Sequence, residues 1–160
     1  MIGPQHVPGT ITRESPLTAD LALLMARHTA DMHADTPPES IYMMDAGQLA
    51  TPAVSFFVLR TAGVPVAMAA FKQIDRTHAE IKSMHVLAEA RGRGLSRRML
   101  DHLVAEAARA GFTRLSLETG VQPTFVAARA LYSRAGFVEC PPFEGYWDDP
   151  NSIFMTRHLA

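Results

Sequence analysis

Arginine and glycine alternate in a stretch near the middle of the chain, residues 91–98 with the sequence RGRGLSRR. Residues 79–86 (AEIKSMHV) before it are strand-like, and apolar residues at three- and four-residue spacings after it indicate an amphipathic helix. Those apolar residues are Leu95, Met99, Leu100, Leu103, Val104 and Ala107. A loop between a strand and a helix N-terminus presents unpaired backbone N–H groups and the positive end of the helix dipole. The stretch therefore has the chemistry of an anion-binding site.

The arginines of this stretch support a phosphate site. Arg97 and Arg98 fall in the first helical turn, where cations oppose the helix dipole and acidic side chains are preferred. This arrangement is unfavourable unless an anion binds among them, the alternative being a solvated basic helix end. The Gly-Lys-Ser/Thr ending of a Walker loop is missing, and Arg97 occupies the place of the third glycine of a dinucleotide fingerprint.

Composition limits the class of protein. A chain of 160 residues with 48% hydrophobic residues suits a single domain, predicted over residues 1–160. Fifteen Lys and Arg nearly balance sixteen Asp and Glu, which argues against a nucleic-acid partner. The single cysteine, Cys140, suits a reducing compartment, and neither a signal peptide nor a run of membrane-spanning length is visible. We expect a cytoplasmic protein without a membrane partner.

The order of predicted elements indicates the fold class. Helices are predicted from about residue 20 to 34, from 95 to 110 and from 123 to 134, each bounded by proline or glycine signals. Strands are predicted at residues 9–13, 53–60, 64–74, 79–86, 113–117, 137–138 and 153–159. The order β-α-βββ-α-β-α-ββ predicts an α/β (α+β) protein with a mixed, mostly antiparallel central sheet flanked by helices.

Two motifs and this element order resemble the GNAT family of N-acetyltransferases. Arg91, Gly94 and Ser96 fill the family pattern Arg/Gln-x-x-Gly-x-Gly/Ala, with serine as the last small residue. Residues 130–137 (ALYSRAGF) resemble the family segment A-L-Y-x-x-x-G-F. The resemblance covers about residues 80–138. Stretches such as PPES, EIKSM and SLETG resemble an uncharacterised bacterial branch, which points to no established acceptor.

The resemblance implies an acyl-CoA N-acyltransferase fold with acetyl-CoA as the donor and no metal. The fourth and fifth strands would splay apart to admit the pantetheine arm, and loop amides would hold the pyrophosphate. Tyr132 would protonate the departing thiolate, although its sequence context alone also suits a packed core tyrosine. Phe125 departs from the asparagine that many members carry there. The implied cofactor-binding set is Met84, His85, Val86, Arg91, Gly92, Arg93, Gly94, Leu95, Ser96, Arg97 and Tyr132.

The reaction also needs a base. An amine with a pKa near 10.4 is mostly protonated at pH 7, and its neutral form costs roughly 4.6 kcal/mol. Glu80, Glu118 or an ordered water could remove the proton. Four residues are predicted to contact the acceptor: His33, Glu39, Ser40 and Tyr42.

Other kinds of site find less support in the sequence. Ser116 has no evident histidine partner, so a hydrolase triad is not expected. The seven histidines are scattered, and His28 and His33 would not share a helix face, so we expect no zinc site.

Three functions remain open. The first is acetyl transfer to a primary amine of a small molecule or peptide by direct attack in a ternary complex. The second is acetylation of protein N-termini or lysines, which needs an open groove beside residues 37–44. The third is a non-catalytic acyl-CoA-binding regulatory module. A homodimer is also an open expectation, since many family members are dimers.

Overall fold

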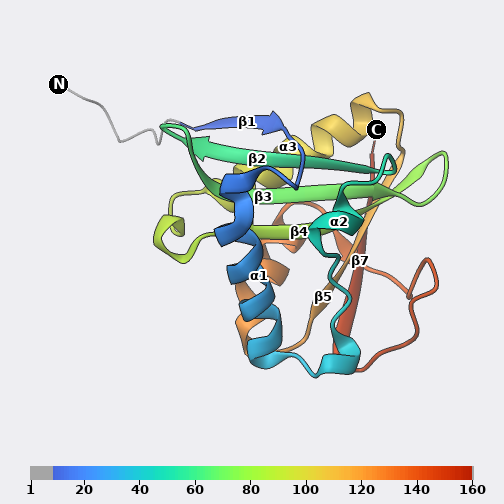
Figure 1. Ribbon diagram of the computed structural model, residues 1–160. Helices are drawn as coiled ribbons and strands as arrows, with labels where there is room; N and C mark the ends of the chain where they lie inside the picture. Colours follow the sequence, from blue (N-terminus) through green and yellow to red (C-terminus); the bar gives the residue numbers. More distant parts are fainter. Residues whose placement is uncertain (1–8, 160) are drawn as a thin grey trace.

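Seven strands form one sheet in the computed structural model, which describes residues 9–159. Their order across the sheet is β1-β2-β3-β4-β5-β7-β6, with β4 and β5 parallel and every other neighbouring pair antiparallel (Figure 1). The strands are β1 (Thr10–Arg13), β2 (Val54–Thr61), β3 (Val64–Gln73), β4 (His78–Val86), β5 (Arg114–Gly120), β6 (Val138–Glu139) and β7 (Ser152–His158). This confirms the predicted fold class.

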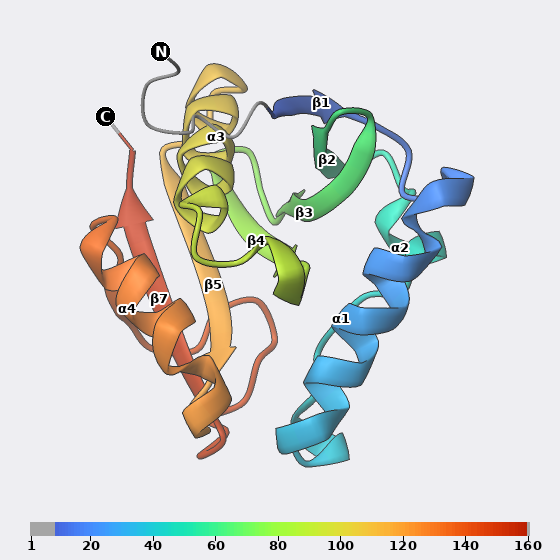
Figure 2. The same cartoon turned by 90° about the vertical axis from the view of Figure 1, so that its left-hand side faces the viewer.

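Helices cover both faces of the sheet. Figure 2 shows α1 on one side and α3 and α4 on the other. The helices are α1 (Ala22–Asp35), α2 (Ala46–Leu49), α3 (Leu95–Arg109) and α4 (Val126–Arg134), with 3-10 turns at Ala19–Leu21, Pro38–Ser40, Ala88–Ala90 and Pro123–Phe125. The predicted order of elements is confirmed, but the sequence analysis missed α2. Its start carries a capping box in which Asp45 and Gln48 bond each other's backbone N–H groups.

The core lies between the sheet and the helices. The side of α3 that packs on the sheet consists of the predicted apolar residues, of which Val104 alone is only partly buried. The central strands β2 and β3 bury long runs of apolar side chains, as expected for strands covered on both faces. The largest fully buried side chains are Phe56, Phe137, Leu21, Leu24, Leu49, Leu59, Met68, Met99, Leu100, Leu103, Leu115 and Leu117.

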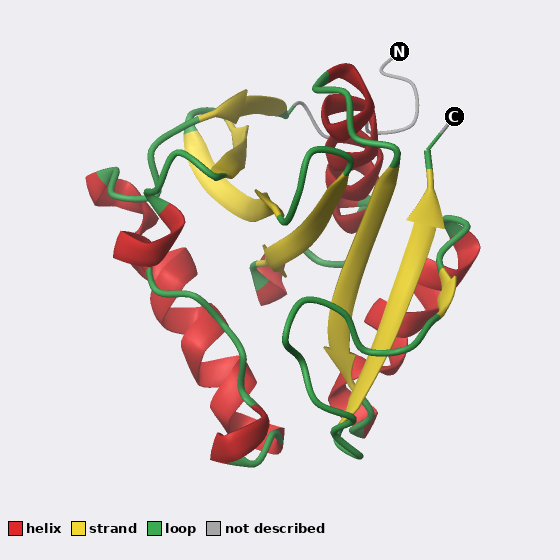
Figure 3. Ribbon diagram, turned by 90° about the vertical axis from the view of Figure 1, so that its right-hand side faces the viewer, coloured by secondary structure: helices red, strands yellow, loops and turns green. Residues whose placement is uncertain are grey.

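The sheet opens between β4 and β5. The two strands pair only from His78 to Glu80, opposite Arg114 to Ser116. Beyond these residues they diverge, as Figure 3 shows, while β5 keeps its pairing with β7 as far as Gly120. The divergence agrees with the expectation that the fourth and fifth strands splay apart. It leaves the edge of β4 that faces β5 without a strand partner beyond Glu80, within the described residues.

A bulge interrupts β4 at this opening. Lys82 pairs with Ala70 and His85 with Met68, so two residues of β4 stand opposite one residue of β3. Ser83, inside the bulge, has φ 57°, a left-handed conformation that is unfavourable for a residue with a side chain. The bulge re-aims the side chains of β4 where the strand lines the opening.

Within residues 9–159, no helix is long and apolar enough to cross a membrane.

Candidate active site

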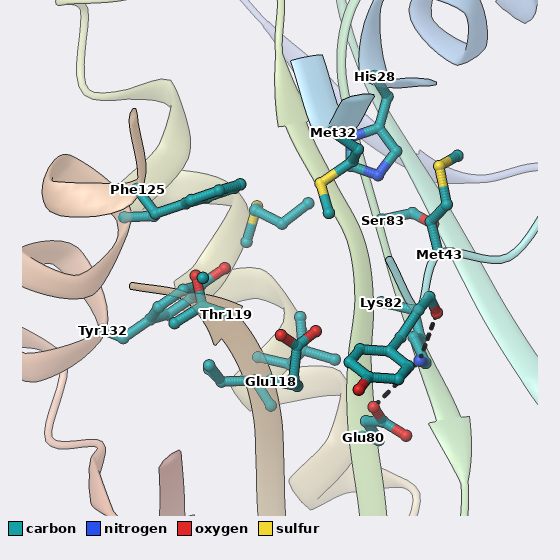
Figure 4. A pocket seen from close by; sticks show the side chains of 16 residues that line it. His28, Met32, Met43, Glu80, Lys82, Ser83, Glu118, Thr119, Phe125 and Tyr132 are labelled. Carbon is teal, nitrogen blue, oxygen red and sulfur yellow. Dashed lines mark hydrogen bonds and ion pairs between the residues drawn. The ribbon is translucent and has the colours of Figure 1, made fainter. Parts of the chain in front are cut away.

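The opening between β4 and β5 forms a cleft lined by five parts of the chain: α1, the segment before α2, β4, β5, and α4 with the turn that precedes it. Figure 4 shows Phe125 and Tyr132 on one side, His28 and Met43 on the other, and Glu118 between them. The lining residues are His28, Met32, Tyr42, Met43, Glu80, Ile81, Lys82, Ser83, Met84, Leu117, Glu118, Thr119, Gly120, Phe125, Ala128 and Tyr132. The structure thus brings together all three predicted catalytic side chains and one predicted acceptor contact, Tyr42.

Glu118 has an environment that suits proton transfer. It belongs to the half of β5 that has separated from β4, and it accepts a hydrogen bond from Ser152 Oγ at 2.8 Å. Burial raises the pKa of its carboxyl to about 7, against the opposing effects of the Ser152 hydrogen bond and the Lys82 charge. The nearby Glu80 charge raises this pKa further. At neutral pH the carboxyl therefore exists in both protonation states.

Glu80 is held in a different way. It is only 3% exposed, the hydroxyl of Tyr146 donates to its Oε2, and Lys82 Nζ lies 3.2 Å from the same oxygen. An ion pair and a hydrogen bond thus offset the desolvation cost of the buried carboxylate. Both contacts are made by the same carboxylate oxygen, Oε2.

Lys82 and Tyr146 connect β4 to the loop between β6 and β7. Lys82 Nζ donates to the Tyr146 hydroxyl at 2.7 Å and to the backbone carbonyl of Tyr42 at 3.2 Å. The Tyr42 hydroxyl donates to Asp149 Oδ2 at 2.6 Å, and the Tyr42 and Tyr146 rings meet edge to face with centroids 5.1 Å apart. Sequence analysis missed Lys82, Tyr146 and Asp149. Only the Glu80–Lys82 spacing, two residues apart on one strand face, was a signal for this cluster.

The other predicted acceptor contacts do not line the cleft. His33 and Glu39 are exposed, and His33 Nδ1 lies 2.9 Å from the Thr29 carbonyl oxygen of its own helix. Ser40 is buried and accepts a hydrogen bond from the Asn151 side chain at 3.3 Å. Ser40 therefore links the segment after α1 to the start of β7.

Tyr132 is buried at the α4 side of the cleft. It is 6% exposed and packs edge to face on Phe137, so the core packing suggested by its sequence context is also present. Burial raises the pKa of the hydroxyl well above its usual range, and the Glu118 charge adds to this. The side chain therefore stays a neutral hydrogen donor at all physiological pH values.

The glycine-rich loop leads into α3 with backbone groups exposed. Gly92 and Gly94 have φ values of 80° and 75°, which residues with a Cβ rarely adopt. No side chain caps the N-terminus of α3, and its first turn holds no acidic residue. Free N–H groups and the helix dipole therefore fit a pyrophosphate at this point.

The loop arginines already have partners within the protein. Arg91 pairs with Asp31 of α1 at 3.1 Å and donates to the Val86 carbonyl at 3.1 Å. Arg97 pairs with Asp101 at 2.9 Å, and Arg98 donates to the Gly9 carbonyl. Most of these guanidinium groups are half exposed, so an anionic ligand could compete for them.

His85 carries its side chain away from the cleft. Its ring lies 5.3 Å from that of His28, and Nδ1 lies 3.9 Å from an Asp31 carboxylate oxygen. His85 was predicted to belong to the cofactor-binding set, and the edge of β4 that faces β5 has no strand partner beyond Glu80 within the described residues. His28 does line the cleft. Its burial lowers the pKa of the imidazole to about 4, and the charge of His85 contributes to this lowering. The imidazole of His28 is therefore neutral at pH 7.

The expectation that Ser116 lacks a histidine partner was wrong. His78 Nε2 lies 2.7 Å from Ser116 Oγ, which is 2.8 Å from Thr156 Oγ1. The pairing of β4, β5 and β7 brings these residues together across 38 and 40 positions of sequence. Ser116 is fully buried and therefore out of reach of a substrate, so this chain of hydrogen bonds fixes strands and does not form a hydrolase site.

Comparison with known proteins identifies the family. The model of the acetyltransferase (GNAT) family matches residues 23–137. The chain belongs to the GNAT family. This family transfers acetyl groups from acetyl-CoA to amine acceptors, so the protein is an acyltransferase that uses acetyl-CoA.

The GNAT assignment is supported by individual relatives. An uncharacterised N-acetyltransferase of Bacillus subtilis (strain 168) is 39% identical over 136 residues, which are 85% of this chain and 90% of the relative. An IAA acetyltransferase of Azospirillum brasilense is 38% identical over 94% of this chain and 97% of its own. A crystal structure of an acyl-CoA N-acyltransferase from Klebsiella pneumoniae has a TM-score of 0.79 with 28% identity, covering 97% of this chain and all of that one.

Within residues 9–159, no group of three or more His, Cys, Asp or Glu side chains is arranged to hold a metal ion.

Proposed function

We propose that this GNAT enzyme acetylates the primary amine of a small molecule by direct attack on acetyl-CoA in a ternary complex. The observation that carries the proposal is the pairing of Glu118, with a pKa of about 7, and the neutral, buried Tyr132 in one cleft. A base with a pKa near the working pH and an acid that remains protonated are the two proton-transfer groups the reaction requires.

Glu118 is the base in this proposal. Its carboxylate form is populated at neutral pH, and its single side-chain hydrogen bond, from Ser152, leaves acceptor positions free for an amine. Glu80 is the weaker candidate because Lys82 and Tyr146 already occupy its carboxylate. Glu80 instead raises the pKa of Glu118 by its charge.

Proton transfers at Glu118 and Tyr132 are electrostatically linked. The amine nitrogen bonds to the acetyl carbon, its proton passes to Glu118, and the carbon–sulfur bond breaks as Tyr132 gives its proton to the CoA sulfur. The charge of Glu118 raises the pKa of Tyr132 in the resting protein. Once Glu118 has taken the amine proton that charge is gone, and Tyr132 becomes a better acid when the thiolate leaves.

The donor would be held by backbone groups of the loop and strand. N–H groups at residues 92–97 would face the pyrophosphate, and Arg91 and Arg93 would add charge. Residues 84–86, on the free edge of β4, would pair with the pantetheine amides as an added strand would.

A small acceptor is favoured over a protein chain by the contacts between residues 41–44 and the β6–β7 loop. Tyr42 and Tyr146 meet edge to face, and their hydrogen bonds to Asp149, Glu80 and Lys82 tie residues 41–44 to the β6–β7 loop. An acetyltransferase for protein N-termini or lysines would need this side open. A non-catalytic binding module would have no need of a carboxyl poised near pH 7 beside a buried tyrosine.

The test is to incubate the purified protein with acetyl-CoA and a panel of small amines, amino acids, peptides and indole-3-acetic acid. The last compound enters because the Azospirillum relative is named as an IAA acetyltransferase. CoA release and product mass are monitored, with Glu118→Gln as the control. We expect acetylated small amines from the native enzyme and little product from the variant. Peptide products alone would favour the protein acetyltransferase, and binding of acetyl-CoA without product would favour the regulatory module.

A further inference from the structure

We propose that the acceptor carries no carboxylate and is a neutral or cationic primary amine. The inference rests on the proposed function and narrows its substrate class. It follows from the hydrogen-bond capacity of Lys82, which is the single Lys or Arg among the lining residues in the described part of the chain.

The Lys82 ammonium is already engaged by protein groups: it makes two hydrogen bonds and one ion pair. An ammonium group offers three donors. Three oxygen atoms lie within 3.2 Å of Nζ: the Tyr146 hydroxyl at 2.7 Å, the Tyr42 carbonyl at 3.2 Å and Glu80 Oε2 at 3.2 Å. The side chain of Lys82 is only 13% exposed, so a fourth partner has little access. Figure 4 shows the group turned toward Glu80.

Exchange of one of these partners for a substrate carboxylate is unfavourable. If a substrate displaced Glu80 from Lys82, the Glu80 carboxylate would remain buried without its cation. Displacement of the Tyr146 hydroxyl would also disturb the edge-to-face contact between Tyr146 and Tyr42. The cluster is therefore built to neutralise Lys82 internally.

The remaining charges of the cleft are also unsuited to a carboxylate. The ionisable acids that line it are Glu80 and Glu118, and the imidazole of His28 is neutral at pH 7. A carboxylate on the acceptor would be a third acidic group beside a single, already paired cation. Like charges placed together are strongly disfavoured in a partly buried site. An ammonium or an uncharged polar group would meet no such repulsion.

Matched amines test the inference. The pairs are tryptophan with tryptamine, phenylalanine with phenylalaninamide, and glycine with glycinamide, each assayed with saturating acetyl-CoA for kcat/KM expressed per neutral amine. We expect the member without a carboxylate to exceed its partner by more than about tenfold in every pair that reacts. A preference for the carboxylate members, or equal rates, would overturn the inference while leaving the proposed function intact.

A variant should change this preference. Glu80→Gln removes the charge that neutralises Lys82, so the ratio between the members of each pair should fall severalfold toward the carboxylates. Glu139→Gln removes one charge on the exposed strand β6 and serves as the matched control, with an unchanged ratio expected. An unchanged ratio in Glu80→Gln would contradict the role given to the Glu80–Lys82 pair.

A binding measurement separates the two proposals. Thermal unfolding of the CoA-loaded protein is recorded with each compound, so that no turnover is needed. Greater stabilisation by tryptamine than by tryptophan supports the inference even if nothing is acetylated, in which case the proposed function alone fails. Equal shifts, including none with either compound, would overturn the inference. Indole-3-acetic acid, a carboxylate, should likewise give no shift.

Discussion

Glu80 and Glu118 line the same cleft but differ in their partners: Glu80 is bonded by Lys82 and Tyr146, and Glu118 by Ser152 alone. The two carboxyl groups lie on the strands that part from each other, β4 and β5. Burial raises the pKa of the Glu118 carboxyl to about 7. This difference separates a carboxyl group held in a buried ion pair from one that can exchange a proton near neutral pH.

The raised pKa of Glu118 predicts a pH-dependent loss of stability. The unfolded chain loses this proton near pH 4.5, whereas the folded protein keeps it until about pH 7. Between these values the native state binds more protons, so the free energy of unfolding falls as pH rises, by up to about 3 kcal/mol. Glu118→Gln should remove this component. Urea denaturation at pH 5 and pH 8 checks it, and equal pH dependence of the variant and the native protein would contradict it.

Tyr132→Phe should lower kcat by about a hundredfold or more, because no proton donor would then meet the departing thiolate. The Phe ring keeps the packing on Phe137, so the melting temperature should change little. The Kd for acetyl-CoA, measured by calorimetry, should also stay within a few-fold. A variant that retained native kcat would show that Tyr132 serves packing alone.

Gly94→Ala should weaken acetyl-CoA binding and also cost about 1 kcal/mol of stability, since φ is 75° at this position. Gly111→Ala is the matched control, with φ 96° and open space around the added Cβ in both cases. Gly111 follows the far end of α3, so its variant should lose similar stability but bind acetyl-CoA normally. Equal effects of the two variants on the Kd would contradict the assigned pyrophosphate loop.

Ser83→Gly should stabilise the protein by about 1 kcal/mol or more. The native serine has φ 57° inside β4, and its Oγ is buried without a hydrogen-bond partner among the described residues. Glycine removes both the backbone strain of the positive φ and the cost of the buried, unbonded hydroxyl. Chemical denaturation measures the change, and a destabilised variant would show that the hydroxyl has a stabilising contact.

Local patterns in the sequence predict most of the fold. The apolar spacing after Gly94 identifies α3, and the glycine-rich loop before it predicts an anion site, because both depend on residues adjacent in sequence. The four-residue helix α2 was missed since a single turn has too few positions to show periodicity. Its capping box, from Asp45 to Gln48, was the only local signal.

Contacts across the sheet explain what the sequence did not predict about the site. Tyr146 meets Glu80 across 66 residues of sequence, and His78 meets Ser116 across 38. Neither separation follows a local period, so neither contact could be found without the strand order. The contact between Tyr146 and Glu80 is one of the observations that favour Glu118 as the proposed base, a choice that the sequence left open.

The pH dependence of kcat/KM tests most directly that Glu118 is the base. With an acceptor found in the panel, log kcat/KM of the native enzyme, expressed per neutral amine, should rise with unit slope below about pH 7 and then level off, since only the carboxylate form accepts the proton. In Glu118→Gln this bend should vanish along with most of the rate. Glu80→Gln should keep a bend, but at lower pH, because the Glu80 charge raises the pKa of Glu118 in the native enzyme. A bend near pH 7 that persists in Glu118→Gln and disappears in Glu80→Gln would contradict the assignment.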